Sequence, residues 1–373
     1  MSSTIESAVR PLGVGILGAG PVTQAIHLPS LARLGDILEV RHIMDVDPAV
    51  AQSVAARVGA THSTRLNELL DDPEVDIVAI CSPHQFHAEQ VIAACRAGKK
   101  AVLCEKPFAM NAEEAARISE VSAETGVPIV VGAMHTFDPG WRAAETHWGD
   151  LPEKTHTIRS SIVLPPNARF EDFATEIVTR PSTTAPDYSD IEVVKAMLQG
   201  GIMGLAIHDL PLVRRFTPDF EQIEVLAARH AAPFGYVISL RTPSRSIELR
   251  AVMSATWKPE WSFEAIADDS ALRIDFTPSY VQAGSAIATF TGASGTETRS
   301  FGPYGHNGYE GEWRELAELA RGTKQPPSAK TLIDDLTFAL AIAEATVKNV
   351  EASENVGASG LAPRATAAAG ASA

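Results

Sequence analysis

Lys106 stands between Glu105 and Pro107, directly after the apolar run AVLC at residues 101–104. The run predicts a buried strand, whereas a carboxylate, an ammonium group and a proline in succession favour neither a strand nor a helix. Ligands of open parallel sheets bind beyond the carboxyl ends of the strands. The sequence therefore places an amine that can exchange a proton where such a ligand would lie. A solvated loop lysine is the alternative.

A neighbouring strand end carries polar residues in the same way. The apolar run 75–81 is followed by a polar, proline-containing segment and then by a helical pattern that closes at Gly98. A solvated loop lysine does not explain why two strand ends share this character. Together they predict one ligand site, with the candidate binding residues Ser82, Pro83, His84, His87, Glu105 and Lys106.

A glycine-rich turn follows the first apolar run, residues 12–17. Gly18 allows a tight turn, and Gly20 lets the backbone approach a pyrophosphate at the N-terminus of a helix. Thr23 replaces the third glycine of the dinucleotide fingerprint, so the motif is incomplete and is weak evidence when taken alone. The candidate binding residues are Gly18, Gly20, Pro21, Val22 and Thr23.

Asp45 ends the second apolar run, residues 37–45. A carboxylate at that place can accept hydrogen bonds from both hydroxyls of an adenosine ribose. A helix-capping role beside Pro48 is the alternative, but strand, turn, helix and acid occur in the order that a dinucleotide site requires. A 2′-phosphate would be repelled by Asp45, and the stretch DVDPAVAQ offers no arginine to bind it. We therefore expect NAD rather than NADP.

Strands and helices alternate through the first part of the chain. Such alternation, with right-handed crossovers, predicts a doubly wound parallel sheet of the α/β class. We assign residues 10–135 to this dinucleotide-binding domain. The expected strands are 12–17, 37–45, 75–81, 100–104 and 128–132.

The pattern changes after about residue 150. Short runs alternate polar and apolar residues, with turns such as 267–270 between them, which predicts an open antiparallel sheet with one covered face. Two helical patterns then close the chain. We expect a C-terminal α+β domain for substrate binding and oligomerisation at 136–355, and a disordered low-complexity tail at 356–373.

Composition narrows the classes of function. The net charge is −15 without a dense Lys/Arg block, which argues against nucleic-acid binding. No segment reads as apolar enough to cross a membrane, and the N-terminus lacks the apolar core of a secretory signal. Cys81, Cys95 and Cys104 are not spaced as disulfide partners or zinc ligands. We therefore expect reduced thiols, no metal site and a cytoplasmic protein.

With these motifs the sequence resembles the glucose–fructose oxidoreductase / inositol dehydrogenase family over roughly residues 10–355. The matching segments are GILGAGPVTQAIHLPSL, CSPHQFHAEQVIAACRAGKKAVLCEKPFAMNAEEA, VGAMHTFDPGW and GYEGEWRELAELARGTKQPP. The resemblance implies a Rossmann domain, bound NAD(H) or NADP(H), and oxidation of a sugar or cyclitol hydroxyl. It also implies a cis bond before Pro107, contact of Lys106 with nicotinamide and substrate, and a homodimer or homotetramer formed through the outer sheet face.

The chain departs from the family where an Asp-x-x-x-His pair commonly stands. In GGIMGLAIHDLPLVRRF, His208 matches the histidine, Gly204 stands at the aspartate position, and Pro211 replaces a second aspartate. Asp209 could supply the missing carboxylate to His208, or it could cap the following helix and leave proton transfer to Lys106. Both roles stay open, and we lean to the second.

A second departure lies in VGAMHTFDP, where Met134 and His135 replace an asparagine and a basic residue that the family often has. His135 is a candidate for substrate contact, and Met134 for packing against sugar or nicotinamide. His27 and His87 match family positions, and we expect them to fix loops around the cofactor rather than to transfer protons.

Alcohol oxidation needs a hydride acceptor and a base for the hydroxyl proton. A neutral histidine can take that proton, and burial would lower the pKa of a lysine enough for it to exchange one. We expect an NAD-dependent dehydrogenase for a sugar, sugar derivative or cyclitol. Transient use of NAD to cleave or rearrange a sugar, and non-catalytic nucleotide sensing, stay open. The candidate catalytic residues are Lys106, His208 and Asp209, and the candidate substrate contacts are Met134, His135 and His208.

Overall fold

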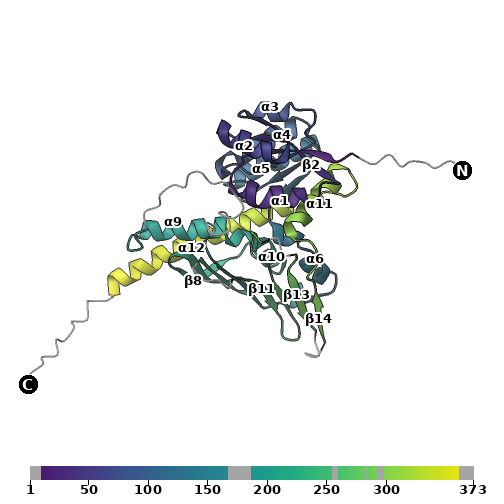
Figure 1. Cartoon of the computed structure of the whole chain (residues 1–373). Coiled ribbons are helices and arrows are strands. Elements are labelled where there is room, and N and C mark those ends of the chain that lie inside the picture. Colours follow the sequence, from purple (N-terminus) through teal and green to yellow (C-terminus); the bar gives the residue numbers. More distant parts are fainter. Residues whose placement is uncertain (1–9, 167–185, 254–258, 282–283, 293–296, 361–373) are drawn as a thin grey trace, which may run out of the picture.

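The computed structural model describes residues 10–166, 186–253, 259–281, 284–292 and 297–360. Figure 1 shows a compact α/β unit above a long twisted sheet, with helices α9 (Ile191–Gly204) and α12 (Ala329–Gly360) running along the sheet on the side of that unit. Sheet A is built from strands between Leu12 and Val131, and sheet B from strands between Thr157 and Phe301. The domain boundary that we propose near residue 135 falls between the two sheets.

Sheet A is parallel throughout, with the order β3-β2-β1-β4-β5-β6. This confirms the doubly wound sheet, and its strand order is that of the dinucleotide-binding Rossmann fold. The strands are β1 Leu12–Leu17, β2 Leu38–Met44, β3 Thr61–Ser63, β4 Ile77–Ile80, β5 Ala101–Cys104 and β6 Ile129–Val131. The helical segments are η1 Thr23–His27, α1 Leu28–Ala32, α2 Pro48–Val58, α3 Leu66–Leu70, η2 His84–Phe86, α4 His87–Arg96 and α5 Ala112–Thr125.

Local sequence sets the ends of these helices. The Asp47 side chain caps α2 by accepting from the backbone N–H groups of Ala49 and Val50, and Gly59 ends the helix at φ 70°. Asn111 and Gly126 do the same for α5. A left-handed residue after the last helical turn is what glycine adopts without a Cβ penalty. The helix ends expected at Gly59 and Gly98 are therefore confirmed, since both glycines have positive φ.

Sheet B has the order β14-β13-β12-β11-β7-β10-β9-β8. All neighbours pair antiparallel except β7 and β10, which are parallel, so the expected antiparallel sheet is in fact mixed. Alternating residues reveal a covered face but not the direction of a neighbouring strand. The strands are β7 Thr157–Leu164, β8 Glu224–His230, β9 Phe234–Arg241, β10 Ser246–Met253, β11 Glu260–Ile266, β12 Ala271–Asp275, β13 Ile287–Thr291 and β14 Thr298–Phe301.

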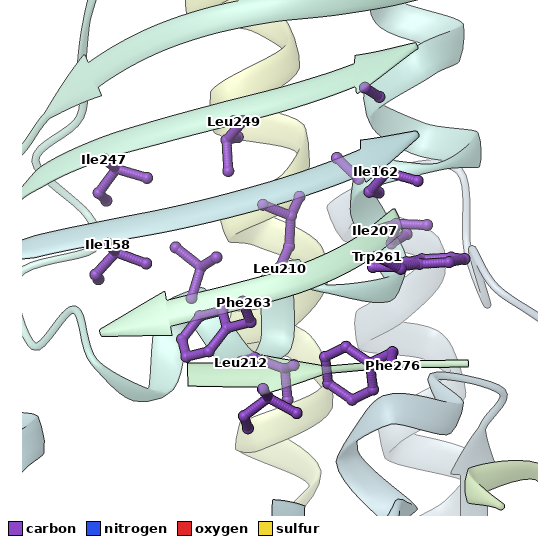
Figure 2. Close-up of a cluster of buried hydrophobic side chains, with 14 of the residues drawn as sticks. Ile158, Ile162, Ile207, Leu210, Leu212, Ile247, Leu249, Trp261, Phe263 and Phe276 are labelled. Atoms are coloured by element: carbon purple, nitrogen blue, oxygen red, sulfur yellow. The ribbon is translucent and has the colours of Figure 1, made fainter. Parts of the chain in front are cut away.

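One face of sheet B is covered by helices. Figure 2 shows Ile158 and Ile162 of β7 and Trp261 and Phe263 of β11 in one cluster with Leu210. The core is built from inward residues of the strands and the apolar side chains of the covering helices, as the period-two pattern requires. The helical segments of this part are η3 Met134–Phe137, α6 Pro139–Glu145, α7 Leu151–Lys154, α9, η4 Ala206–His208, α10 Leu210–Arg215, α11 Gly308–Ala320 and α12.

Helix α11 returns to the N-terminal domain. Trp313 and Leu316 are fully buried in a cluster with Val14 and Ile16 of β1 and with Leu103 of β5. The start of α12 likewise packs on α5 through Leu336. Residues from the end of the chain therefore complete the core around sheet A.

Two sequence-based expectations need correction. Helix α12 extends to Gly360, so the first part of the tail expected at 356–373 is helical, and the remainder lies outside the described residues. The window Ile191–His208 has a mean hydropathy of 1.2, enough by length and composition to cross a membrane, although no such segment was expected. This window packs against α12 and β9, and 39% of it is buried, which is weak evidence for a membrane span.

Candidate active site

The turn after β1 is fixed by its own backbone. Gly18 has φ 92°, and a Cβ there would lie 2.8 Å from the backbone of Cys81 and Ser82, so no other residue fits. The Thr23 hydroxyl donates to the Gly18 carbonyl oxygen at 2.6 Å. Thr23 thus stabilises the turn from the position where the fingerprint has a third glycine.

Gly20 differs from Gly18 in its surroundings. A Cβ at Gly20 would meet no atom of the described chain within 4 Å, so internal packing does not require glycine there. The first turn of the following helix has N–H groups without intrahelical acceptors. A bare backbone beside free N–H groups fits the close approach of a pyrophosphate.

Asp45 lies beside this turn at the end of β2. Its Oδ2 accepts a hydrogen bond from the N–H of Ala19 at 2.8 Å, and its Oδ1 accepts from the N–H of Asp47 at 2.9 Å. Asp47, rather than Asp45, caps α2. The capping alternative for Asp45 is therefore wrong, and the carboxylate is held next to the glycine turn.

The residues after β4 and β5 are tied together by His87. Its ring nitrogens lie 2.8 Å from the carbonyl oxygens of Pro107 and Ser82. Ser82 also donates from its hydroxyl to Gln90 at 2.6 Å. Burial, followed by the nearby His87, lowers the pKa of His84 below its ordinary value. The structure thus brings the two polar strand ends together, and His87 connects them.

Glu105 is bound by the buried ring of His27, which is itself oriented by Trp313. The Trp313 indole N–H, which can only donate, points to Nδ1 of His27 at 3.2 Å, and Nε2 of His27 lies 3.0 Å from Glu105 Oε1. His27 therefore carries its proton on Nε2 and donates to Glu105. Burial raises the pKa of the Glu105 carboxyl, but the hydrogen bond from His27 and the charge of Lys106 outweigh it and leave the pKa lowered.

Lys106 reaches from the Rossmann domain to the segment that departs from the family pattern. The Lys106–Pro107 peptide bond is cis, as the resemblance implied. Nζ of Lys106 donates to the backbone carbonyl of Gly204 at 2.9 Å. Burial lowers the pKa of the Lys106 ammonium group, and the nearby Glu105 only partly opposes this. A carbonyl oxygen thus holds the lysine where the family commonly has a carboxylate.

His208 is buried in a setting that keeps it neutral. Its Nδ1 lies 3.1 Å from Sδ of Met134, a weak acceptor, so Nδ1 carries the proton. Burial first, and then the charge of Lys106, lower the pKa of His208 well below its ordinary value. The lone pair on Nε2 is therefore available to take a proton. The packing of Met134 against sugar or nicotinamide stays a prediction, and its thioether contacts His208.

Asp209 serves neither role considered from the sequence. The backbone of Asp209 stands at the N-cap position of α10, but its side chain makes no capping hydrogen bond. The carboxylate instead accepts from the Ser160 hydroxyl at 2.6 Å, from the Trp261 indole N–H at 2.9 Å, and lies 2.7 Å from Nδ1 of His135. Its partner is thus His135, whose ring stacks on Phe276 with centroids 3.7 Å apart.

The rings of His135 and His208 lie close together. Their ring centroids are 6.3 Å apart, and each ring also meets Trp261 edge to face. The site therefore combines a lysine with a lowered pKa, a neutral histidine and a second histidine oriented by a buried carboxylate. Such a set can remove or supply a hydroxyl proton beside a hydride acceptor.

The N-terminal domain is similar to a known protein family. Residues 12–133 match the family described as an oxidoreductase family with an NAD-binding Rossmann fold. The match covers the N-terminal domain, which is therefore similar to this oxidoreductase family. The match ends before sheet B, and it includes the glycine turn, Asp45 and the Glu-Lys-Pro segment.

Several proteins that are similar to part of this chain are named as dehydrogenases. This chain is 38% identical over 130 residues to inositol 2-dehydrogenase 3 of Saccharopolyspora erythraea, and the match covers 35% of this chain and 38% of that protein. It is 34% identical over 171 residues to inositol 2-dehydrogenase of Acidothermus cellulolyticus, covering 44% and 49%. D-glucoside 3-dehydrogenase of Escherichia coli is 32% identical over 144 residues, covering 37% and 38%. The matches thus span less than half the length of each relative.

Solved structures share the fold over almost the whole chain. KijD10, a 3-ketoreductase of Actinomadura kijaniata in complex with NADP and TDP-benzene, has a TM-score of 0.66 at 20% identity and covers 89% of this chain and 97% of its own. UDP-N-acetylglucosamine 3-dehydrogenase GnnA of Acidithiobacillus ferrooxidans has a TM-score of 0.68 at 18% identity, covering 92% and 100%. At such low identity these structures show the fold of both domains and no more.

Sequence reasoning missed the residues that come from distant elements. Ser160 and Trp261 on sheet B bind Asp209, Phe276 stacks on His135, and Trp313 orients His27. Each stands in an ordinary strand or helix pattern without a local motif. A tryptophan in a buried strand, which needs an acceptor for its N–H group, is the one available signal.

Proposed function

We propose that this protein belongs to the oxidoreductase family that its N-terminal domain matches, and that it is an NAD-dependent dehydrogenase for a secondary hydroxyl group of a sugar, sugar derivative or cyclitol, or a reductase for the corresponding ketone. The convergence of Lys106 and His208 beside Gly204 carries the proposal. Lys106 Nζ is fixed at 2.9 Å from the Gly204 carbonyl oxygen, and His208 follows in the same segment as a neutral base. Proton-handling groups with shifted pKa values in a domain seam are typical of catalytic sites.

The nicotinamide cofactor, when bound, supplies the hydride acceptor or donor at C4. Gly18, Gly20 and the first helical turn would hold its pyrophosphate, and Asp45 its adenosine ribose. Oxidation moves a hydride from the substrate carbon, and the hydroxyl proton passes to Lys106 or to Nε2 of His208. Ionised Glu105 next to Lys106 favours the charged ammonium and so opposes the effect of burial on its pKa.

Asp45 supports NAD as the cofactor. Its carboxylate is held at the edge of the glycine turn by the N–H groups of Ala19 and Asp47, where it can accept from two ribose hydroxyls. A 2′-phosphate in that place would bring two negative groups together. The choice between NAD and NADP is tested by binding both to the same protein.

A panel of sugars and polyols with NAD, followed at the NADH absorbance, tests the activity. We expect net NADH from at least one secondary alcohol, and Lys106→Ala should lower turnover by about 10²–10⁴ while the cofactor Kd changes by only a few-fold. Product formed without net NADH would favour transient use of NAD. Binding of NAD with no turnover across the panel, and an unchanged thermal shift on adding sugars, would favour a sensor.

We also propose a cytoplasmic homodimer or homotetramer that associates through the outer face of sheet B. Leu226, Val237 and Ile287 are 49%, 49% and 42% exposed, and Val237 stands between two buried residues of β9, as expected for a side chain on the uncovered face. Exposed apolar side chains on one sheet face support association. Light scattering should give a mass of a dimer or tetramer, and Val237→Glu should shift it toward the monomer.

A further inference from the structure

A cavity of about 390 Å³ lies at the seam between the two domains. One wall is formed by residues 106–108 and the edge strand β6, and the other by α6, α10 and α12. Of the described residues that line this seam cavity, Lys106 alone belongs to the candidate active site. This volume is in the range of cavities that bind small molecules, so the seam cavity is large enough to hold a ligand.

Most of the seam cavity is apolar. Side chains from both domains contribute, and they offer a surface for an aliphatic or aromatic group rather than for a sugar, which needs many hydrogen-bond partners. These side chains are Phe108, Val131, Phe137, Trp141, Ile207, Leu332 and Leu336.

Three arginines line the same cavity, and each pairs with a carboxylate from another element. Arg142 Nη1 lies 2.6 Å from Glu315, Arg215 Nε lies 3.4 Å from Glu145, and Nε of Arg214 pairs with Asp335. The Arg214 side chain is 17% exposed, compared with 40% for Arg142 and 53% for Arg215. Arg214 is therefore the most sheltered of the three cations.

The charges around the cavity leave an excess of positive charge. Lys106 and the three arginines face the carboxylates of Glu145, Glu315 and Asp335. Glu315 is also neutralised by Lys324 at 2.7 Å. Burial raises the pKa of Asp335, and the charge of Arg214 opposes this shift. This balance favours an anion over a cation or a neutral ligand.

Arg214 has donors to spare for that anion. Within the part of the chain that the structure describes, only its Nε makes a hydrogen bond, so Nη1 and Nη2 keep N–H groups. A guanidinium group donates and never accepts, and its planar fork matches a carboxylate. Among the same residues, Arg215 also engages only its Nε, but Arg214 is the more sheltered of the two and lies beside the apolar walls of the cavity.

We propose that the seam cavity binds a small amphipathic carboxylate, with its apolar body between β6 and α12 and its carboxylate on Nη1 and Nη2 of Arg214. A ligand in this position touches both domains and stabilises their arrangement. It also meets Ile207 and Pro211, which lie on either side of the His208–Asp209 pair in sequence. The seam cavity borders the candidate active site at Lys106, but binding of a carboxylate at Arg214 does not depend on the proposed reaction.

Calorimetry on the full chain with saturating NAD tests this with 4-phenylbutyrate as the probe and 4-phenylbutanamide as its uncharged match. We expect the carboxylate to bind at least about tenfold more tightly than the amide, because charge-assisted hydrogen bonds are stronger than neutral ones. Equal affinity for the two probes, or loss of carboxylate binding when NAD is added, would overturn the proposal.

Substitutions test whether the carboxylate binds at Arg214 or is merely attracted by the positive charge of the protein surface. Arg214→Gln should abolish the preference for the carboxylate, whereas Arg215→Gln, which alters an exposed arginine of the same helix, should leave the affinity within about twofold. Arg214→Gln leaves Asp335 without its partner, so Arg214→Gln/Asp335→Asn checks the result in a charge-balanced protein. Leu332→Trp, which fills the cavity, should remove binding of both probes. Unchanged carboxylate binding in Arg214→Gln or Leu332→Trp would contradict the assignment.

Discussion

Oδ1 of Asp209 lies 2.7 Å from Nδ1 of His135, although the sequence neighbour of Asp209 is His208. The carboxylate is 1% exposed and also accepts from Ser160 and Trp261. It therefore fixes one ring tautomer of His135, in the way that a buried carboxylate orients a catalytic histidine. Among the residues that the structure describes, the ring of His208 has only the weak acceptor Sδ of Met134.

Asp209→Asn is expected to be costly, because an uncharged amide cannot replace a carboxylate that accepts from several buried donors. We expect turnover to fall at least about tenfold, and the free energy of unfolding to fall by about 1.5–3 kcal/mol. Steady-state kinetics and urea unfolding measure the two effects. Asp190→Asn, at the exposed N-cap of α9, is the control and should change neither, because asparagine caps as well as aspartate. Parent-like turnover in Asp209→Asn would show that the His135 contact is dispensable.

The pH dependence of turnover should reflect the protonation of His208. A base must be neutral, and the pKa of His208 lies well below the ordinary value of 6.5, so oxidation should persist as the pH falls through 6.5 and decline only at lower pH. Lys106→Met removes a positive charge that lowers this pKa, so the acid limb of the residual activity should move to higher pH. An acid limb that stays in place, or moves down, would exclude His208 as the titrating base.

The lowered pKa of His208 also predicts how the free energy of unfolding depends on pH. His208 is neutral in the folded protein but takes up a proton in the unfolded chain below about 6.5. Its stabilising contribution is complete above that value and is lost as the pH falls toward the lowered pKa. His208→Gln should therefore flatten the fall in unfolding free energy below pH 6.5, measured by urea titrations across pH. Other buried groups remain in both proteins and cancel in the comparison.

Asp45→Ala should narrow the preference for NAD over NADP. Removing the carboxylate takes away the ribose acceptor and the repulsion of a 2′-phosphate, so NAD should bind more weakly and NADP no worse. Calorimetry with both cofactors measures the ratio. Asp47→Asn keeps the cap of α2 and serves as the control. Equal binding of NAD and NADP by the parent protein would contradict the preference itself.

Gly18 and Gly20 should respond differently to alanine. Gly18→Ala forces a Cβ into the backbone of Cys81 and Ser82 at φ 92°, so the protein should be destabilised. A Cβ at Gly20 meets nothing within 4 Å, so Gly20→Ala should keep its melting temperature and lose cofactor affinity. Thermal melts without cofactor and NAD titrations distinguish the two. A Gly20→Ala protein that binds NAD as the parent does would argue against pyrophosphate at this turn.

The fold of the N-terminal domain could be predicted from the sequence because the patterns that indicate it are local. Apolar runs, the turn at Gly18 and the helix ends at Gly59 and Gly98 each depend on a few neighbouring residues. Sheet B was recognised by its alternation, but the parallel pairing of β7 with β10 was not, because pairing direction is decided by long-range topology.

In the candidate site, too, local features could be predicted from the sequence and long-range contacts could not. Lys106, Asp45 and His208 stand in motifs that can be read along the chain. The partner of Asp209 could not be found in this way, since His135, Ser160 and Trp261 come from three separate elements. The capping role rested on chain position alone, and burial of the carboxylate among donors overrides it.

Helix α11 has a consequence for how the protein can be made. Trp313 and Leu316 close the core around β1 and β5, and Trp313 holds the ring that binds Glu105. During synthesis, residues 10–135 therefore precede Trp313 of α11 by about 180 residues, and until α11 is made the part of the core that Trp313 and Leu316 cover stays open. An excised fragment 10–135 keeps that part of its core open, so the N-terminal domain needs the end of the chain to complete its fold.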